Sequence, residues 1–86
     1  MLTDTEVLDV VRGAVARVLE IDAATIGPQS AFTADLGADS LALVEIVELV
    51  EEQLAPHARP GFRIEDEDLE ELRTVGEAVS YAVARL

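Results

Sequence analysis

The chain has 86 residues, no cysteine and a formal net charge of -12 at pH 7. This length predicts one small domain, residues 1–86, and the absence of thiols excludes disulfide bonds and zinc sites built on cysteine. The excess of acid disfavours nucleic acid and anionic membranes as partners, because both require clustered Lys and Arg. A basic partner protein is its natural complement, and acidity that only keeps the protein soluble explains the charge equally well.

The first predicted element is a helix over about residues 3–19. Thr3 and Glu6 have the spacing of a capping box. Apolar residues then recur at intervals of three and four, as on one face of a helix: Val7, Leu8, Val11, Ala14, Val15, Val18 and Leu19. The start of the chain lacks the basic and long apolar regions of a signal peptide, and no apolar run is long enough to span a bilayer, so we expect a cytoplasmic protein.

A long loop is predicted next, over residues 20–39. This segment has no sustained helical period and contains several turn-forming residues. A loop of this length is unusual in a compact domain. We therefore expect its own apolar side chains, Ile26, Phe32 and Leu36, to hold it against the core.

A second helix is predicted over residues 40–54, and it has two distinct faces. One is an apolar stripe that predicts a core contact, formed by Leu43, Ile46, Val47, Val50 and Leu54. The other mixes carboxylates with two exposed apolar residues, and is formed by Leu41, Val44, Glu45, Glu48 and Glu52. A merely solvated surface would also explain the second face.

The remaining chain predicts a loop, a short helix and a third long helix. Residues 55–63 hold two prolines and a glycine, and so cannot be helical throughout. A short acidic helix over residues 65–72 would turn Leu69 and Leu72 toward the core. A second capping box, Thr74 and Glu77, precedes apolar residues at helical spacing. Together these elements predict an all-α fold, a small bundle of three main helices and one short helix.

Ser40 is the candidate for chemistry. Asp39 is a good N-cap, which places Ser40 at the first helical position, where the helix dipole and free N–H groups favour an anion such as a phosphate ester. An ordinary helix start has the same local pattern. His57, the only histidine, lies in the proline-rich loop at the far end of the helix, so a hydrolase built on Ser40 would lack a base. The acidic run 65–71 lacks the spacing of a calcium-binding loop.

The stretch FTADLGADSLALVEIVELVEE, residues 32–52, closely resembles the acyl carrier proteins of bacterial fatty acid and polyketide synthesis. The family's signature, Asp-Leu-Gly-x-Asp-Ser-Leu before an acidic helix, reads here as residues 35–41, and the order of elements agrees over essentially the whole chain. The resemblance implies that Ser40, between Asp39 and Leu41, carries 4'-phosphopantetheine derived from coenzyme A. The thiol of that arm would hold acyl intermediates as thioesters. It also implies a carrier and not an enzyme, and we expect a monomer that does not insert into membranes.

The resemblance implies partners as well: a phosphopantetheinyl transferase, a ketosynthase, an acyltransferase and other synthase enzymes with basic docking patches. They would dock on the second face of the second helix. Leu41 and Val44 would supply apolar contacts, and the acids Asp39, Glu45, Glu48 and Glu52 would meet Lys and Arg. The aliphatic interior would be offered to an acyl chain, with Val11, Val47, Val50 and Val79 as candidate lining residues. Each of these valines taken alone fits plain core packing better.

The connection over residues 54–64 departs from the family, because it is longer than in the usual fatty acid carrier. This favours a discrete carrier of a polyketide or related secondary-metabolite pathway, such as antibiotic biosynthesis, over the housekeeping carrier of fatty acid synthesis. A tolerated surface insertion explains the loop equally well. Two further alternatives are a peptidyl or aminoacyl carrier, whose motif typically lacks the Asp-Leu-Gly-x-Asp lead, and an unmodified acidic adaptor protein.

Overall fold

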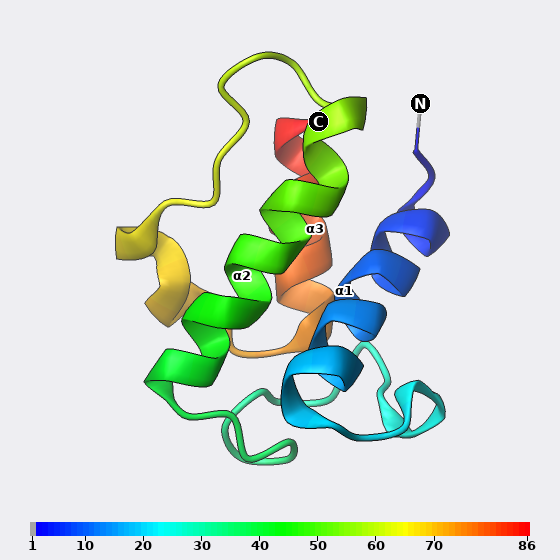
Figure 1. Cartoon of the computed structure of the whole chain (residues 1–86), viewed down its shortest axis with the longest axis vertical. Coiled ribbons are helices and arrows are strands. Elements are labelled where there is room, and N and C mark those ends of the chain that lie inside the picture. The colour runs from blue at the N-terminus through cyan, green and yellow to red at the C-terminus, as the bar shows by residue number, and fades with distance from the viewer. Residues whose placement is uncertain (1) are drawn as a thin grey trace.

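The computed structural model describes residues 2–86, and in that range it is helical without strands (Figure 1). The three long helices are α1 (Asp4–Leu19), α2 (Ser40–Leu54) and α3 (Val75–Arg85). Three short 3₁₀ helices lie between them: η1 (Ala23–Thr25), η2 (Ala55–His57) and η3 (Asp66–Glu71). The predicted bundle of three main helices and one short helix is confirmed. The short helix is η3, and the two single turns η1 and η2 were not predicted.

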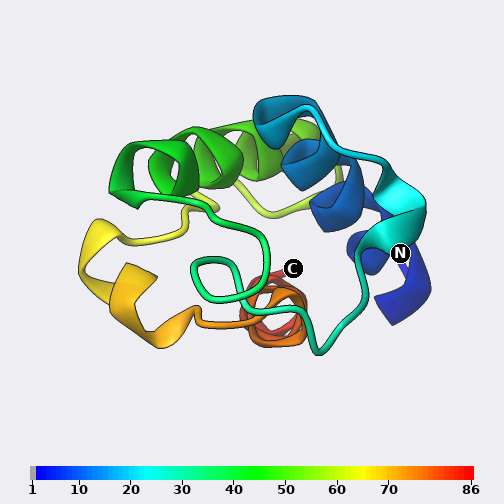
Figure 2. The ribbon, with the colours of Figure 1, turned by 90° about the horizontal axis from the view of Figure 1, so that it is seen from below.

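The long helices form a bundle in which α1 packs against both α2 and α3. Figure 1 shows α2 and α3 running in the same direction and α1 running against them. The long loop crosses one end of the bundle from α1 to α2, and η3 lies beside α2 in both views (Figures 1 and 2). The start of α2 therefore lies at the end of the bundle that the long loop closes, whereas η2 lies at the opposite end.

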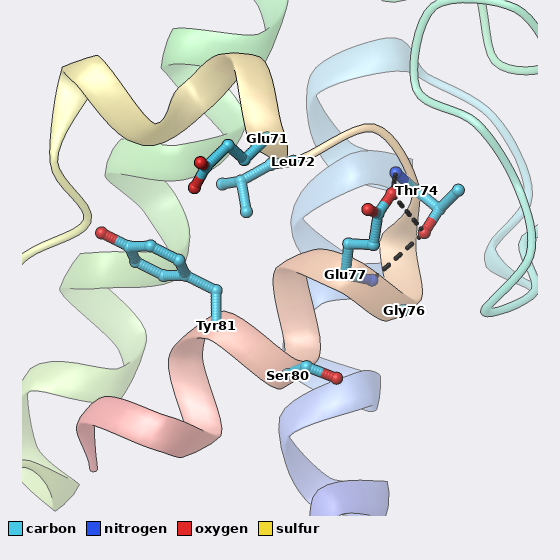
Figure 3. A pocket seen from close by; sticks show the side chains of 7 residues that line it. All are labelled: Glu71, Leu72, Thr74, Gly76, Glu77, Ser80 and Tyr81. Atoms are coloured by element: carbon cyan, nitrogen blue, oxygen red, sulfur yellow. Dashed lines mark hydrogen bonds between the residues drawn. The ribbon is translucent and has the colours of Figure 1, made fainter.

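The helices begin at the predicted caps. Thr3 is the N-cap of α1, so the helix starts one residue later than expected, and its hydroxyl accepts a hydrogen bond from the Glu6 N–H at 3.2 Å. The Glu6 carboxylate in turn accepts from the Thr3 N–H at 3.0 Å. Thr74 and Glu77 make the same reciprocal pair at the start of α3, at 3.1 and 3.0 Å (Figure 3). Both capping boxes are thus confirmed.

The core is aliphatic apart from one phenylalanine. The buried side chains on the long helices are Val7, Val11, Ala14, Val15, Ile46, Val47, Val50, Leu54, Val75 and Ala82. Residues at the edges of the predicted stripes, including Leu8, Val18 and Leu43, are only half-buried and pack around this centre. Within residues 2–86, no helix combines the length and the apolar character needed to cross a bilayer.

The long loop is held by the apolar residues that the sequence singled out. Ile26 and Phe32 are buried, and Leu36 is half-buried against the core. Ala38 is also buried, at 2% exposed, although its small side chain gave no signal in the sequence pattern. The loop thus contributes to the hydrophobic core of the bundle.

Backbone hydrogen bonds join the loop to the start of α3. The Phe32 N–H donates to the Arg73 carbonyl at 2.9 Å, and the Val75 N–H donates to the Ser30 carbonyl at 3.0 Å. Farther along, the Gly76 N–H donates to the carbonyl of residue 28 at 2.7 Å. Segments more than forty residues apart in the chain are therefore bonded directly to each other beneath α2.

Tyr81, the only tyrosine in the chain, joins α3 to η3. Its hydroxyl donates to the Asp68 carboxylate at 2.5 Å and accepts from the Glu65 N–H at 3.3 Å. The Arg85 guanidinium lies over the ring, 3.4 Å from its centroid. Figure 3 shows the ring pointing from α3 toward the segment that carries η3.

These contacts predict that the phenol of Tyr81 titrates at a higher pH in the folded chain than in the unfolded chain. Partial burial and the hydrogen bond to Asp68 raise the pKa of Tyr81 above its usual value. The protonated phenol therefore adds stability at pH values below the unfolded pKa of about 10. That stability is lost as the pH rises through the folded pKa. With no tryptophan and one tyrosine in the chain, tyrosinate absorbance should show a higher midpoint in the folded chain than in urea. Asp68→Asn should lower the folded midpoint, and equal midpoints would contradict the contact.

Candidate functional site

Ser40 is the first residue of α2 and is exposed at the end of the bundle. Asp39 is the N-cap: its carboxylate accepts from the Ala42 N–H at 2.8 Å, and its carbonyl accepts from the Leu43 N–H at 2.9 Å. The first N–H groups of an α-helix have no partner within it and form the positive end of the helix dipole. The Ser40 hydroxyl therefore lies where a negative charge is stabilised, and the predicted helix start is confirmed.

The residues before Ser40 form a turn that is closed by hydrogen bonds among its own residues. The Asp35 carboxylate accepts from the Ala31 N–H at 2.7 Å, and the Asp35 N–H donates to the Ala31 carbonyl at 3.0 Å. The Ala38 N–H donates to the Phe32 carbonyl at 2.8 Å. Because Ala38 and Phe32 are both buried, this turn fixes the position of Asp39. Sequence reasoning gave Asp35 no role, since its partner is a backbone group whose position only the fold determines.

Gly37 is required by the shape of this turn. Its φ of 72° lies in the left-handed region, which costs a residue with a Cβ roughly 1 kcal/mol or more. A Cβ built there would meet no atom within 4 Å. The glycine of the motif is thus needed for its backbone conformation, and space around it is not the reason.

An apolar groove begins at Ser40. It has a volume of about 200 Å³ and is lined by Ser40, Leu43, Val44, Leu69 and Glu70. Leu43, which the sequence predicted in the core, is half-buried because one side of it faces this groove. A second hollow of about 350 Å³ shares Leu43, Leu69 and Glu70 with the first and continues to Phe32 and Arg73. An exposed hydroxyl, a helix N-terminus and an adjacent apolar groove together fit a phosphate-linked arm with an apolar end.

The second face of α2 is exposed, as the sequence predicted. Leu41 is 69% exposed and is the only large apolar side chain so exposed within residues 2–86. Glu45, Glu48 and Glu52 are exposed along the same face, while Val44 is half-buried beside the groove. The ion pairs in the described part of the chain involve none of these three glutamates. The face therefore presents an apolar side chain next to Ser40, followed by a row of free carboxylates.

The four candidate acyl-lining valines do not share one surface. Val11, Val47 and Val50 are buried together in the core, whereas Val79 is half-buried. Val79 lines a separate groove of about 180 Å³ with Leu8 and other residues of α1, the long loop and α3. A role for these valines in holding an acyl chain stays a prediction.

Nothing in the structure supports a catalytic use of Ser40. His57 lies in η2, beyond the other end of α2 and about 25 Å from Ser40 at 1.5 Å per residue. It instead lines a small hollow with Leu2, Val83 and Leu86. A larger hollow of about 630 Å³ lies between η3 and α3 (Figure 3). The hydroxyl-bearing residues that line it are Thr74, which caps α3, Ser80, and Tyr81, whose hydroxyl is bonded to Asp68, and no histidine lines it.

Known proteins show clear similarity to this chain. Residues 9–82 match the protein family described as "Phosphopantetheine attachment site". The acyl carrier protein of Chlamydia caviae is 36% identical over 77 residues, which cover 90% of this chain and 92% of that protein. A solved structure of the acyl carrier protein from Enterococcus faecalis is 34% identical and has a TM-score of 0.74, covering 99% of this chain and 100% of the other.

Proposed function

Since this chain belongs to the acyl carrier protein family, whose members carry 4'-phosphopantetheine and are not enzymes, we propose that Ser40 is the attachment residue. One observation carries this proposal: Ser40 is an exposed hydroxyl at the first residue of an α-helix, beside an apolar groove. The other two serines lack that setting. Ser30 accepts a hydrogen bond from the Gly27 N–H within the long loop, and Ser80 lies inside α3.

The residues around Ser40 would position the arm. The N–H groups at the start of α2 would stabilise the phosphodiester, while Asp39 keeps the helix capped. The groove lined by Leu43, Val44 and Leu69 would shelter the apolar part of the arm and its cargo. The thiol of the bound arm supplies the thioester chemistry, which explains how a chain without cysteine can carry acyl groups.

The acidic face of α2 is the proposed docking face, defined by Leu41, Val44, Glu45, Glu48 and Glu52. Its carboxylates are free to meet basic patches on the transferase, the ketosynthase and the acyltransferase. Exposed ion pairs contribute at most about 1 kcal/mol each. Contacts of that strength suit a shuttle, because the carrier must leave each enzyme after a single step.

We propose a specialised carrier of a polyketide or related secondary-metabolite pathway. The connection between α2 and η3 is the supporting feature, since it is longer than in the usual fatty acid carrier and carries its own basic residues. The housekeeping role in fatty acid synthesis is the second candidate.

Two steps test this function. Purified chain is first incubated with coenzyme A and a promiscuous phosphopantetheinyl transferase, and intact mass should rise by one phosphopantetheine. A wild-type chain that gains no mass contradicts the carrier proposal. The chain is then expressed in bacteria depleted of their own fatty acid carrier, with re-expression of that host carrier as the control. At equal levels of modified protein, we expect the control alone to restore growth, and growth with this chain would assign the housekeeping role.

A further inference from the structure

The basic residues of this chain are unevenly distributed. It has six arginines, one histidine and no lysine, against 18 acids. Three of these seven basic side chains, His57, Arg59 and Arg63, fall within residues 55–64, a stretch that contains no acid. All three are exposed. The stretch leaves the C-terminal end of α2, at the end of the bundle opposite Ser40 (Figure 1).

A defined turn separates the two arginines. The Arg59 carbonyl accepts from the Phe62 N–H at 3.2 Å, with Pro60 and Gly61 between them. Gly61 has a φ of 88°. Proline at the second position and a left-handed glycine at the third are the signature of a type II β-turn. The backbone between Arg59 and Arg63 therefore has a fixed shape.

The turn is also anchored to the bundle. Phe62 is half-buried against the core, and Ile64 is buried. The Ile64 N–H donates to the Glu51 carboxylate of α2 at 2.6 Å. These anchors hold the backbone of the turn beside α2, so its arginines are placed relative to the acidic face of that helix.

Two other arginines of the chain serve the fold. Arg12 lies 3.6 Å from the Asp9 carboxylate and donates to the Ala23 carbonyl at 2.8 Å. Arg85 covers the Tyr81 ring, as described above. Among the side chains that the structure describes, which leave out Asp66, the ion pairs and side-chain hydrogen bonds involve none of Arg17, Arg59, Arg63 and Arg73, and of these only Arg59 and Arg63 lie close together in the chain.

We propose that Arg59 and Arg63 form a second docking contact, the cationic turn, which binds an acidic patch on the partner ketosynthase. This proposal rests on the proposed docking face. Helix α2 is about 22 Å long at 1.5 Å per residue. The chain therefore presents free carboxylates along the helix, and positive charge beside its last turn, where the Ile64 N–H bonds to Glu51. A matching partner offers basic residues near its active site and acidic residues farther away. Docking the carrier in the opposite orientation would place like charges of the two proteins together. The carboxylates of α2 and the arginines of the turn would therefore fix the orientation of Ser40 on the partner.

An acidic protein patch fits the cationic turn better than a nucleic acid or a membrane does. The net charge of -12 and the glutamates of α2 next to the turn repel any extended polyanion. A protein surface can instead confine its negative charge to the turn and present positive charge to α2.

The absence of lysine provides a direct test. Arg59→Lys/Arg63→Lys keeps the charge and introduces the only lysine amines, and acetylation of the N-terminus removes the remaining amine. A carbodiimide then joins such an amine to a carboxylate in direct contact, forming an amide and releasing a urea. With a ketosynthase that accepts the acyl group from this chain as the probe, we expect cross-links from position 59 or 63 to one cluster of Asp and Glu. Arg17→Lys, at an exposed position of α1, is the matched control and should give no cross-link to the ketosynthase. No cross-link, or equal yield from position 17, overturns the proposal.

Charge reversal measures the effect on function. For the same ketosynthase, Arg59→Glu/Arg63→Glu should lower kcat/KM about tenfold at low salt, as two exposed ion pairs would, with a smaller loss at high salt. Arg17→Glu should have little effect, and an equal loss there would overturn the proposal. Two other results would also overturn the proposal: self-association of the wild-type chain that the double variant abolishes, or binding of the wild-type chain to phosphatidylserine vesicles that the double variant abolishes. All variants should still accept phosphopantetheine from the promiscuous transferase, so failure of this proposal is distinguishable from failure of the carrier function.

Discussion

Alanine in place of Ser40 is expected to abolish the attachment of phosphopantetheine completely. The phosphodiester needs the serine oxygen, and neither of the other two serines is the first residue of an α-helix: Ser30 lies in the long loop, where its hydroxyl accepts from the Gly27 N–H, and Ser80 lies inside α3. Intact mass after incubation with coenzyme A and the promiscuous transferase measures the outcome. The variant should keep its apo mass under conditions in which the wild-type chain is fully converted.

Two controls make this result specific. Ser80→Ala removes an exposed hydroxyl elsewhere and should load as fast as wild type. Because the Ser40 side chain is exposed, Ser40→Ala should change the free energy of unfolding by only about 0.5 kcal/mol or less, which helical circular dichroism in urea can check. A mass gain in folded Ser40→Ala would place the attachment on another residue.

Phe32→Ala is expected to cause the largest loss of stability, about 3–5 kcal/mol in the free energy of unfolding. Phe32 is 2% exposed and is the only aromatic residue in the buried core. Its removal leaves a cavity where the long loop packs on the bundle, next to the turn that leads to Ser40. A domain of this size has only about 5–15 kcal/mol in total, so the variant should be marginally folded. Urea unfolding followed by helical circular dichroism gives the difference.

Phe62 provides the matched control, because the chain contains two phenylalanines and this one is only half-buried. Phe62→Ala should cost less than half as much as Phe32→Ala. Loading of the folded Phe32→Ala fraction should also be slower, since the turn that fixes Asp39 would lose its support. Equal losses in the two variants would show that the loop contributes no more than an ordinary surface contact.

Local signals in the sequence predicted the helices well. The capping boxes at Thr3 and Thr74, and the N-cap at Asp39, placed the starts of all three long helices to within one residue. Apolar periodicity identified most of the core, because the pattern of a helix repeats every few residues and can be read along the chain. The exposed setting of Ser40 followed from the same cap.

Features that depend on distant segments were not predictable in this way. Three such features depend on how η3 lies against α2 and α3. They are the 3₁₀ form of η3, the half-burial of Leu43 beside a groove, and the hydrogen bond from Tyr81 to Asp68. Ala38 is buried because the turn of the motif folds inward, and a small side chain gives no periodic signal. The bond from Asp35 to Ala31 likewise appears only once the loop has closed.

The backbone hydrogen bonds between residues 28–32 and 73–76 have a consequence for protein synthesis. The turn that fixes Asp39 and Ser40 rests on a segment that the ribosome makes more than thirty residues later. Chain elongation proceeds at about 5–20 residues per second, so the serine is translated seconds before its support exists. The proposed attachment site thus takes its final shape only after the start of α3 has been made, and a nascent chain truncated before residue 73 would not present it. In this fold, readiness for the proposed modification depends on hydrogen bonds to a segment that is translated later than the serine.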